Sequence, residues 1–187
     1  YAKSLADDPE SEALLREVLR IAEQQAMWPR LAIALEEALA QAQGSDTTRN
    51  LQMQLGQLYQ YRLRSSHKAE AHIKAVVAQN PDDGEALRLL EEIYETAGDL
   101  DNLVKVCESR ARLPLDVAER IQLYRKIASV SDLKNDDAAA LRAHQAILEL
   151  DPGDDESLTA LERLYERAED FTSLVQVVAR RAEFATE

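Results

Sequence analysis

The chain has 187 residues, of which 45% are hydrophobic and 30% are charged. Five glycines, five prolines and 5% aromatic residues are too few for an all-β fold, which needs many turn residues and strand-forming aromatics. A single cysteine excludes a disulfide framework and a cysteine-based zinc cluster, and the net charge of −13 disfavours binding to phosphate backbones and anionic membranes. No run of about 18 apolar residues is present, as a transmembrane helix would require. The composition therefore predicts a soluble, acidic, helical protein.

The sequence repeats itself with a period of about 71 residues. Pro81 and Pro152 each follow an Asn or Asp, and the apolar positions after them match without a gap at an offset of 71. A third copy begins at Pro9, which lies 72 residues before Pro81. Three copies at nearly equal steps indicate a repeat architecture.

Each step contains four predicted helices, because four sets of apolar residues recur at helical spacing. Gly98 separates the first set from the second, and Pro114 ends the second. Asp116 and Glu119 form a capping-box pattern that begins the third helix, and Asn135 precedes the fourth. The preceding step has one extra residue, which we place in the turn of its second hairpin. Paired in order, the helices form five hairpins at about residues 9–43, 46–80, 82–113, 116–151 and 153–186.

Local motifs identify the type of repeat. The pattern Leu55-Gly56-x-x-Tyr59 lies on the first helix of a hairpin, and small residues such as Ala69 and Ala140 lie where paired helices touch. With these marks the chain resembles the tetratricopeptide repeat (TPR) family along nearly its whole length. The resemblance implies an all-α fold, a right-handed α-solenoid of about five antiparallel hairpins.

The chain also reads as a segment of a longer array. Residues 1–5 precede Asp8-Pro9 as residues 72–77 precede Asn80-Pro81, so they match the last turns of a helix whose beginning is absent. No polar capping helix follows Ala182, although solenoids need such caps for solubility. We therefore expect a parent protein that continues in both directions and terminal helices exposed to self-association. We expect a cytoplasmic location, with any targeting signal outside this segment.

Few residues are typical of catalysis or metal binding. Cys107 falls on a repeated apolar position and is expected to be a buried hydrophobe, while Trp28 and Phe171 open second helices and are expected in hairpin cores. The three histidines are scattered and lack supporting cysteines, which favours packing and surface roles. We expect no catalytic residues, no metal, no cofactor and no enzymatic activity.

Polar residues on the first helix of each hairpin form the candidate partner site, because the resemblance implies that this helix lines a concave groove. Arg16, Arg88 and Arg125 take the same place in three hairpins, which predicts a stripe of guanidinium groups that binds carboxylates. The alternative is pairing on the helix surface, such as Arg88 with Glu92. The full candidate set is Arg16, Arg20, Met53, Gln57, Tyr61, Arg88, Glu92, Glu95, Arg125, Ser129, Arg163 and Arg167.

The predicted function is a protein–protein interaction scaffold that presents this groove to a peptide segment or a folded partner. The first alternative is a structural spacer that stacks end to end and holds no groove ligand. RNA binding is disfavoured by the acidic charge and the lack of a long basic stripe. Neither nucleic acid nor membrane is an expected partner.

Overall fold

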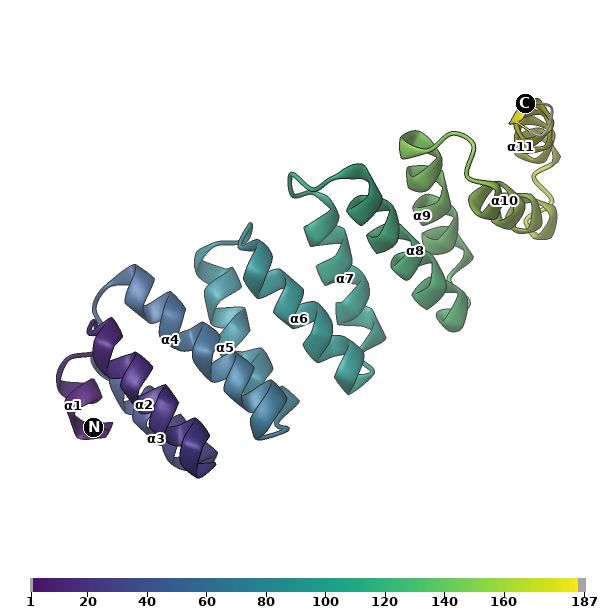
Figure 1. Ribbon diagram of the computed structural model, residues 1–187. Helices are drawn as coiled ribbons and strands as arrows, with labels where there is room; N and C mark the ends of the chain where they lie inside the picture. Colours follow the sequence, from purple (N-terminus) through teal and green to yellow (C-terminus); the bar gives the residue numbers. More distant parts are fainter. Residues whose placement is uncertain (1, 185–187) are drawn as a thin grey trace. The chain divides into compact units, whose positions relative to one another are not determined.

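The computed structural model describes residues 2–184, with side chains described from Ser4 onward. Throughout this range the regular structure is helical, as the sequence predicts (Figure 1). The chain divides into two compact units, the first ending at Asp99 and the second beginning at Leu100. The first unit contains α1 (Ala2–Asp7), α2 (Glu12–Gln25), α3 (Trp28–Gln41), α4 (Ser45–Gln57), the π-helix η1 (Leu58–Arg62), α5 (Ser66–Gln79) and α6 (Gly84–Ala97). The second contains α7 (Leu100–Ala111), α8 (Val117–Lys134), α9 (Asp137–Leu150), α10 (Asp155–Arg167) and α11 (Phe171–Phe184).

Aspartates at hairpin turns start several of these helices. Asp83, Asp116 and Asp154 each accept a hydrogen bond from the backbone N–H three residues on, which satisfies one of the unpaired donors at a helix start. Asp116 bonds the N–H of Glu119 at 2.7 Å, so the predicted capping position is confirmed. The Glu119 side chain does not return to the cap but pairs with Arg110, whose Nη2 lies 2.9 Å from its Oε1.

In the first unit, α3 packs against α4, α4 against α5 and α5 against α6, and α1 packs against α3. At Gly56, α4 and α5 approach closely, because a Cβ at this position would lie 2.2 Å from Cδ1 of the fully buried Ile73. The glycine of the Leu55-Gly56-x-x-Tyr59 pattern therefore sets the approach of the two helices.

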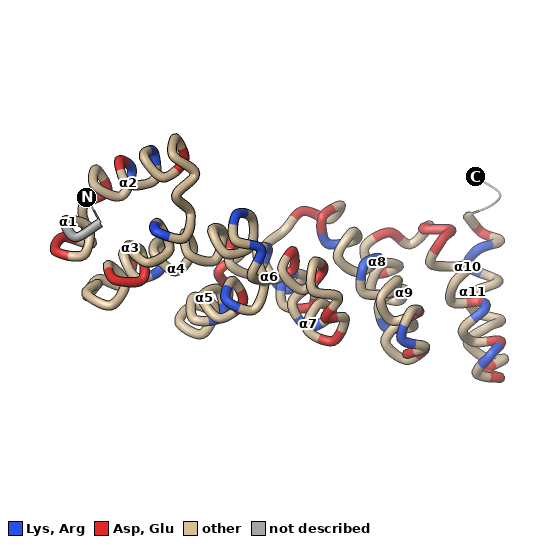
Figure 2. Tube along the Cα trace, turned by 90° about the horizontal axis from the view of Figure 1, so that it is seen from below, with Lys and Arg blue, Asp and Glu red and all other residues tan. Residues whose placement is uncertain are grey.

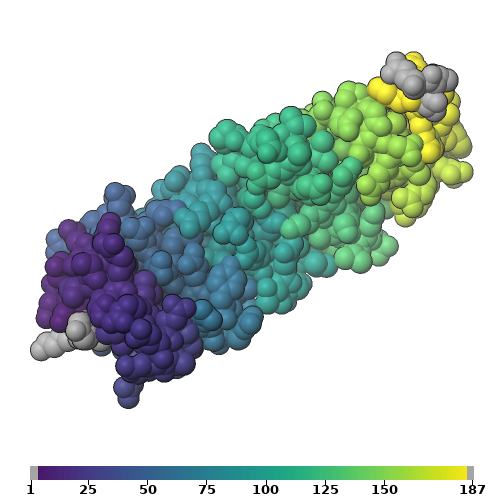
Figure 3. All heavy atoms as spheres, viewed as in Figure 1, coloured from purple at the N-terminus to yellow at the C-terminus, as the bar shows by residue number. Residues whose placement is uncertain are grey.

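In the second unit, α8 packs against α7 and α9, and α10 packs against α9 and α11. Ala140 is fully buried in a cluster with Leu158, Leu161 and Tyr165, which belong to α10 and so to the next hairpin. Cys107 is likewise fully buried, which confirms its role as a core residue. The space-filling view shows the helices of each unit in contact along the visible face (Figure 3).

The extra residue of the first unit lies in a helix and not in a turn. Arg64 and Asn135 both adopt the left-handed conformation that ends a helix, with φ of 53° and 54°. In the first unit the N–H of Ser65 donates to the carbonyl of Tyr59, and in the second the N–H of Asp136 donates to the carbonyl of Ser131. The hydrogen-bonded loop at the helix end is therefore one residue longer in the first unit. The π-helix η1 takes up that residue, and the turn placement predicted from the sequence is wrong.

Candidate functional site

A groove in the second unit lies between α8, the start of α9, and α10. One part has a volume of about 580 Å³ and is lined by Asp132, Asn135, Asp137, His144, Ala160, Arg163, Leu164, Glu166 and Arg167. An adjoining part of about 420 Å³ shares Asp132, His144, Ala160 and Arg163 and extends along α8 to Ser129 and Arg125. We call the two parts together the α8–α10 groove.

The floor of this groove is small and uncharged. His144 on α9 is 7% exposed, and its Nδ1 lies 3.2 Å from the buried Ser157 Oγ. Burial lowers the pKa of His144, which keeps the imidazole neutral near pH 7. Ala160 on α10 presents only a methyl group beside it. A ligand therefore meets a neutral ring and a methyl group at the base of the groove.

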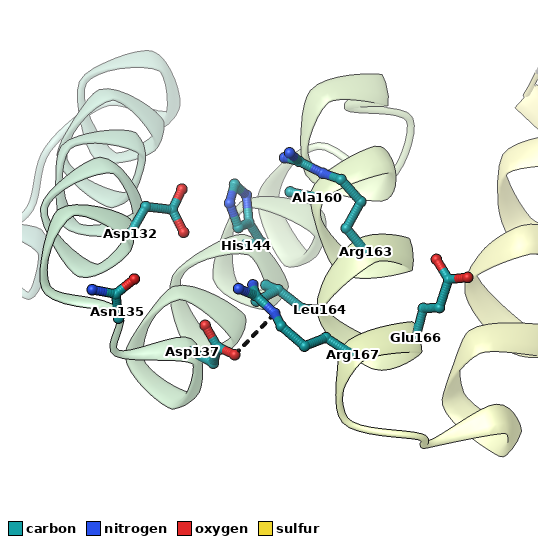
Figure 4. A pocket seen from close by; sticks show the side chains of 9 residues that line it. All are labelled: Asp132, Asn135, Asp137, His144, Ala160, Arg163, Leu164, Glu166 and Arg167. Carbon is teal, nitrogen blue, oxygen red and sulfur yellow. Dashed lines mark ion pairs between the residues drawn. The ribbon is translucent and has the colours of Figure 1, made fainter.

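The walls carry charges of both signs (Figure 4). Asp132 and Asp137 approach from the α8–α9 side, while Arg163 and Arg167 extend from α10, with His144 between the two sides. Arg167 pairs with Asp137, with 3.1 Å between Nε and Oδ2. Arg163 makes no hydrogen bond or ion pair with any residue in the range 2–184. Among the described residues, Arg163 is therefore the arginine of this groove whose guanidinium is not held in an ion pair.

Arg125 occupies the far end of the groove but is committed to the fold. It contacts Asp154, which is buried, and its Nε lies 3.5 Å from Glu156 Oε2. Burial opposes ionisation of Asp154, but hydrogen bonds from Ser157 and Arg125 outweigh it and lower the pKa of the carboxyl group. Arg125 thus neutralises a buried N-cap and joins α8 to the start of α10.

The same cluster occurs in the first unit. Arg49 on α4 places Nε 2.6 Å from Oδ2 of the buried Asp83, and its Nη2 lies 2.9 Å from Glu85 Oε2. The hydrogen bond from Arg49 is the main reason that the pKa of Asp83 is lowered. We call these two arrangements the Arg–Asp–Glu clusters. The sequence analysis missed Arg49, whose cap partner lies 34 residues further along the chain.

Solved structures with a similar fold were found. No family model matches the sequence, and no curated protein is similar enough to count as a relative. The crystal structure of MamA, a TPR-like protein, matches 92% of this chain and 90% of its own at 15% identity, with a TM-score of 0.55. MamA 41-end from Desulfovibrio magneticus RS-1 matches 93% of this chain and 94% of its own at 15% identity, with a TM-score of 0.52. The fold is a TPR-like helical repeat.

Within the TPR-like repeat, the predicted arginine stripe is mostly engaged in local pairs. Arg88 lies 2.6 Å from Glu92, between Nη1 and Oε1, which confirms the alternative of surface pairing. Arg16 and Arg20 pair with Glu12 and Glu17, at 3.8 Å and 2.6 Å between the nearest charged atoms, on the same helix. These pairs lie at the surface, where each contributes less than about 1 kcal/mol.

The remaining predicted residues fall into separate groups. Met53 is 4% exposed and packs in the core, so its assignment to an open groove surface is wrong. Gln57 and Tyr61 line a second pocket, in the first unit. Glu95 is exposed on α6 and lines neither the α8–α10 groove nor the pocket with Gln57 and Tyr61. Ser129, Arg163 and Arg167 meet in the α8–α10 groove with Arg125.

One expectation for the TPR-like core is also wrong. Phe171, at the start of α11, is 64% exposed, whereas Trp28 at the matching position of α3 is half-buried.

Within residues 2–184, no three His, Cys, Asp or Glu side chains are grouped as a metal site. We also find no helix in this range with the length and apolarity that crossing a membrane requires.

Proposed function

We propose that the chain is a protein-interaction scaffold and that the α8–α10 groove binds a carboxylate-bearing segment of a partner protein. Arg163 carries this proposal, because its guanidinium extends into the groove without a partner among the described residues. A guanidinium holds a carboxylate through two parallel hydrogen bonds. Asp132 and Asn135 on the opposite wall offer acceptors for the N–H groups of the same segment.

The surroundings of the groove favour a selective interaction. Acidic and basic positions alternate along α10 (Figure 2), and Glu162 and Glu166 lie near Arg163 in the sequence, so its positive charge is local. A polyanion such as RNA needs many phosphate contacts and is therefore a poor fit. The similarity to the MamA structures supports a TPR-like fold, and the groove is an inference from this chain's own residues.

A charge reversal tests this function. Proteins of the source organism are captured at low salt by the immobilised chain and compared with those captured by Arg163→Glu. We expect the variant to lose the partner while its melting temperature stays unchanged, because Arg163 is exposed and makes no contact that the fold needs.

Lys105→Glu is the matched control. Lys105 is exposed on α7 and does not line the groove, so its reversal should leave capture intact. Capture by the unmodified chain should also weaken as salt rises, since exposed charges are screened beyond about 8–10 Å. Equal capture by Arg163→Glu and the unmodified chain would contradict the groove assignment.

A second candidate function is end-to-end stacking, which the surface of α11 favours. Phe171, Val175 and Val178 on this helix are 64%, 67% and 48% exposed. At an offset of 71, Val178 matches Cys107 on α7, which is fully buried in the unit where α7 packs against α8. The apolar face of α11 therefore has the character of a helix interface that no helix in the range 2–184 covers.

Sedimentation over a range of concentrations tests stacking. If a second copy covers α11, the average mass should rise with concentration, and Val175→Lys should keep the chain monomeric. Arg163→Glu should not change this association. A chain that stays monomeric at high concentration would exclude stacking through α11.

A further inference from the structure

A pocket in the first unit is formed by α2, the start of α3, α4 and η1. Its volume is about 500 Å³. The base is apolar and is formed by the half-buried Leu19 and Trp28 with the buried Leu31 and Leu58. We call it the Trp28 pocket. A volume in the range 300–1,000 Å³ with an apolar lining and a few polar groups is typical of ligand sites.

The π-helix shapes the rim of this pocket. Tyr61 and Arg62 both lie in η1, where the extra residue of the first unit is taken up. The matching end of α8 in the second unit is regular α-helix and carries Leu133, which is 71% exposed, at the place of Arg62. Single π-turns within α-helices occur frequently at functional sites, because they redirect side chains without ending the helix.

The charged groups at the rim are already compensated. The Arg62 guanidinium lies 4.6 Å over the centre of the Trp28 ring, and its Nη2 is 3.7 Å from Glu23 Oε1. The Tyr61 hydroxyl donates to Glu92, and burial together with this bond raises the pKa of Tyr61 to about 12. The rim therefore offers no uncompensated charge to a ligand, and an ionic group would lose its hydration without gaining an opposite charge.

Two amides face this apolar pocket without partners. Gln54 and Gln57 line it and are three residues apart, which places them on one face of α4. Neither side chain makes a hydrogen bond to another residue in the range 2–184. A glutamine amide has one acceptor oxygen and two N–H donors, which matches the alternating groups of an extended peptide backbone.

We propose that the Trp28 pocket binds an uncharged extended peptide segment with one large apolar side chain, of the leucine or phenylalanine type. The side chain contacts Leu19 and Trp28, while Gln54 and Gln57 pair with the flanking peptide groups. This inference rests on the proposed scaffold function, but it concerns a different unit, different residues and a neutral ligand. The two sites can therefore fail independently.

Capped single amino acids are suitable probes, because each presents one side chain between two amide groups. We would titrate the chain with N-acetyl-leucinamide, N-acetyl-phenylalaninamide and N-acetyl-glycinamide. Trp28 is the single tryptophan of the chain, so its fluorescence reports on this pocket alone. We expect saturable binding of the leucine and phenylalanine probes with a Kd on the order of 1–10 mM, which is typical of ligands of this size. The glycine probe should give no saturable response.

A double variant separates the pocket from unspecific contact. Gln54→Ala with Gln57→Ala should weaken binding of the leucine probe by about fivefold or more through lost hydrogen bonds. The matched control is Gln25→Ala with Gln79→Ala, at exposed helical positions outside the pocket, and it should bind as the unmodified chain does. Arg163→Glu should also leave probe binding unchanged, even if it removes partner capture.

Nuclear Overhauser contacts from the leucine methyls to the Trp28 indole would locate the bound probe. Three results would overturn the proposal: no saturable response to the apolar probes, an equal response to the glycine probe, or equal affinity of the pocket and control double variants. Melting curves of both double variants establish that each is folded, and alanine is the residue best accommodated in a helix.

Discussion

The segment α4–η1–α5–α6 of the first unit and the segment α8–α9–α10 of the second have the same framework with different linings. Both carry an Arg–Asp–Glu cluster, with Arg49 or Arg125 neutralising a buried helix cap. The first has a π-helix beside a pocket whose charges are compensated, whereas the second has a regular α8 beside a groove with the unpaired Arg163. The contacts that join successive hairpins are thus maintained while the lining chemistry differs.

The largest expected effect comes from breaking the Arg–Asp–Glu clusters. Arg125→Ala and Arg49→Ala should each reduce the free energy of unfolding by about 2–4 kcal/mol, because a buried carboxylate loses its counter-charge. The arginines are about one-third exposed, so we expect less than for a fully buried pair. Urea unfolding monitored by circular dichroism measures the change.

Arg88→Ala is the comparison for these variants. Arg88 forms only an exposed pair one helical turn away, and its loss should change stability by less than about 0.5 kcal/mol. If Arg88→Ala were as destabilising as Arg125→Ala, the distinction between structural and surface arginines would be wrong.

A smaller effect is expected where α4 meets α5. Gly56→Ala should lower the free energy of unfolding by about 1–2 kcal/mol. The new methyl group would overlap Ile73, and the free-energy cost of this overlap exceeds the gain in helix propensity. Adding Ile73→Val should recover part of the loss, since it removes the overlapping Cδ1 atom. The reverse change in the second unit, Ala128→Gly, should cost only about 1 kcal/mol of helix propensity. Thermal melts that show Gly56→Ala to be stabilising would contradict the close approach.

Deleting one residue should convert the first segment into the second. Gln60 is buried, and without it the burial pattern of the first helix end follows that of α8 at residues 130–135, except that Leu63 is half-buried where Lys134 is exposed. We expect the deletion to give a continuous α-helix at a cost of about 1–2 kcal/mol, since Gln60 Nε2 bonds Thr96 Oγ1 at 3.0 Å. Backbone chemical shifts measure the helix type. The Trp28 pocket should lose its response to N-acetyl-leucinamide.

The smallest expected effect is pH dependence from one histidine in each unit, the half-buried His72 and the buried His144. Burial lowers the pKa of both His72 and His144 in the folded chain. The unfolded chain therefore binds protons first, so this contribution is fully present above about pH 6.5 and is lost as the pH falls through 6.5 toward the lower folded values. His72→Gln and His144→Gln should each reduce the change in urea midpoint between pH 7.5 and 5.5. An unchanged pH dependence in either variant would exclude that histidine as its source.

The sequence predicts the framework well because the framework is periodic. The helices, the cap at Asp116, the buried Cys107 and the pairing of Arg88 with Glu92 all follow from spacing within a hairpin. A count of residues also reveals that the step from Pro9 to Pro81 is one residue longer than the step from Pro81 to Pro152. Whether a turn or a helix takes it up depends on the bonds made by the buried Gln60, which no local pattern encodes.

The site is less predictable because its pairs join different hairpins. Arg125 pairs with Asp154, which lies 29 residues further along the chain. Helical spacing therefore does not reveal that this arginine is engaged in a structural ion pair. The repeat offset also identifies which positions are apolar, but it does not show whether another helix packs over these side chains. Phe171 shows this, since its position is apolar in each copy and yet it is exposed on α11.

The burial of Cys107 allows the opening of the second unit to be measured by thiol labelling. A thiol reagent reacts only with an accessible thiolate, and this sulfur is enclosed on α7, which packs against α8. Labelling at low reagent concentration then proceeds only when the helices separate, and its rate divided by that of a free thiol gives the fraction of time the unit is open. As the chain has no other cysteine, one absorbance trace follows this opening without any engineered label.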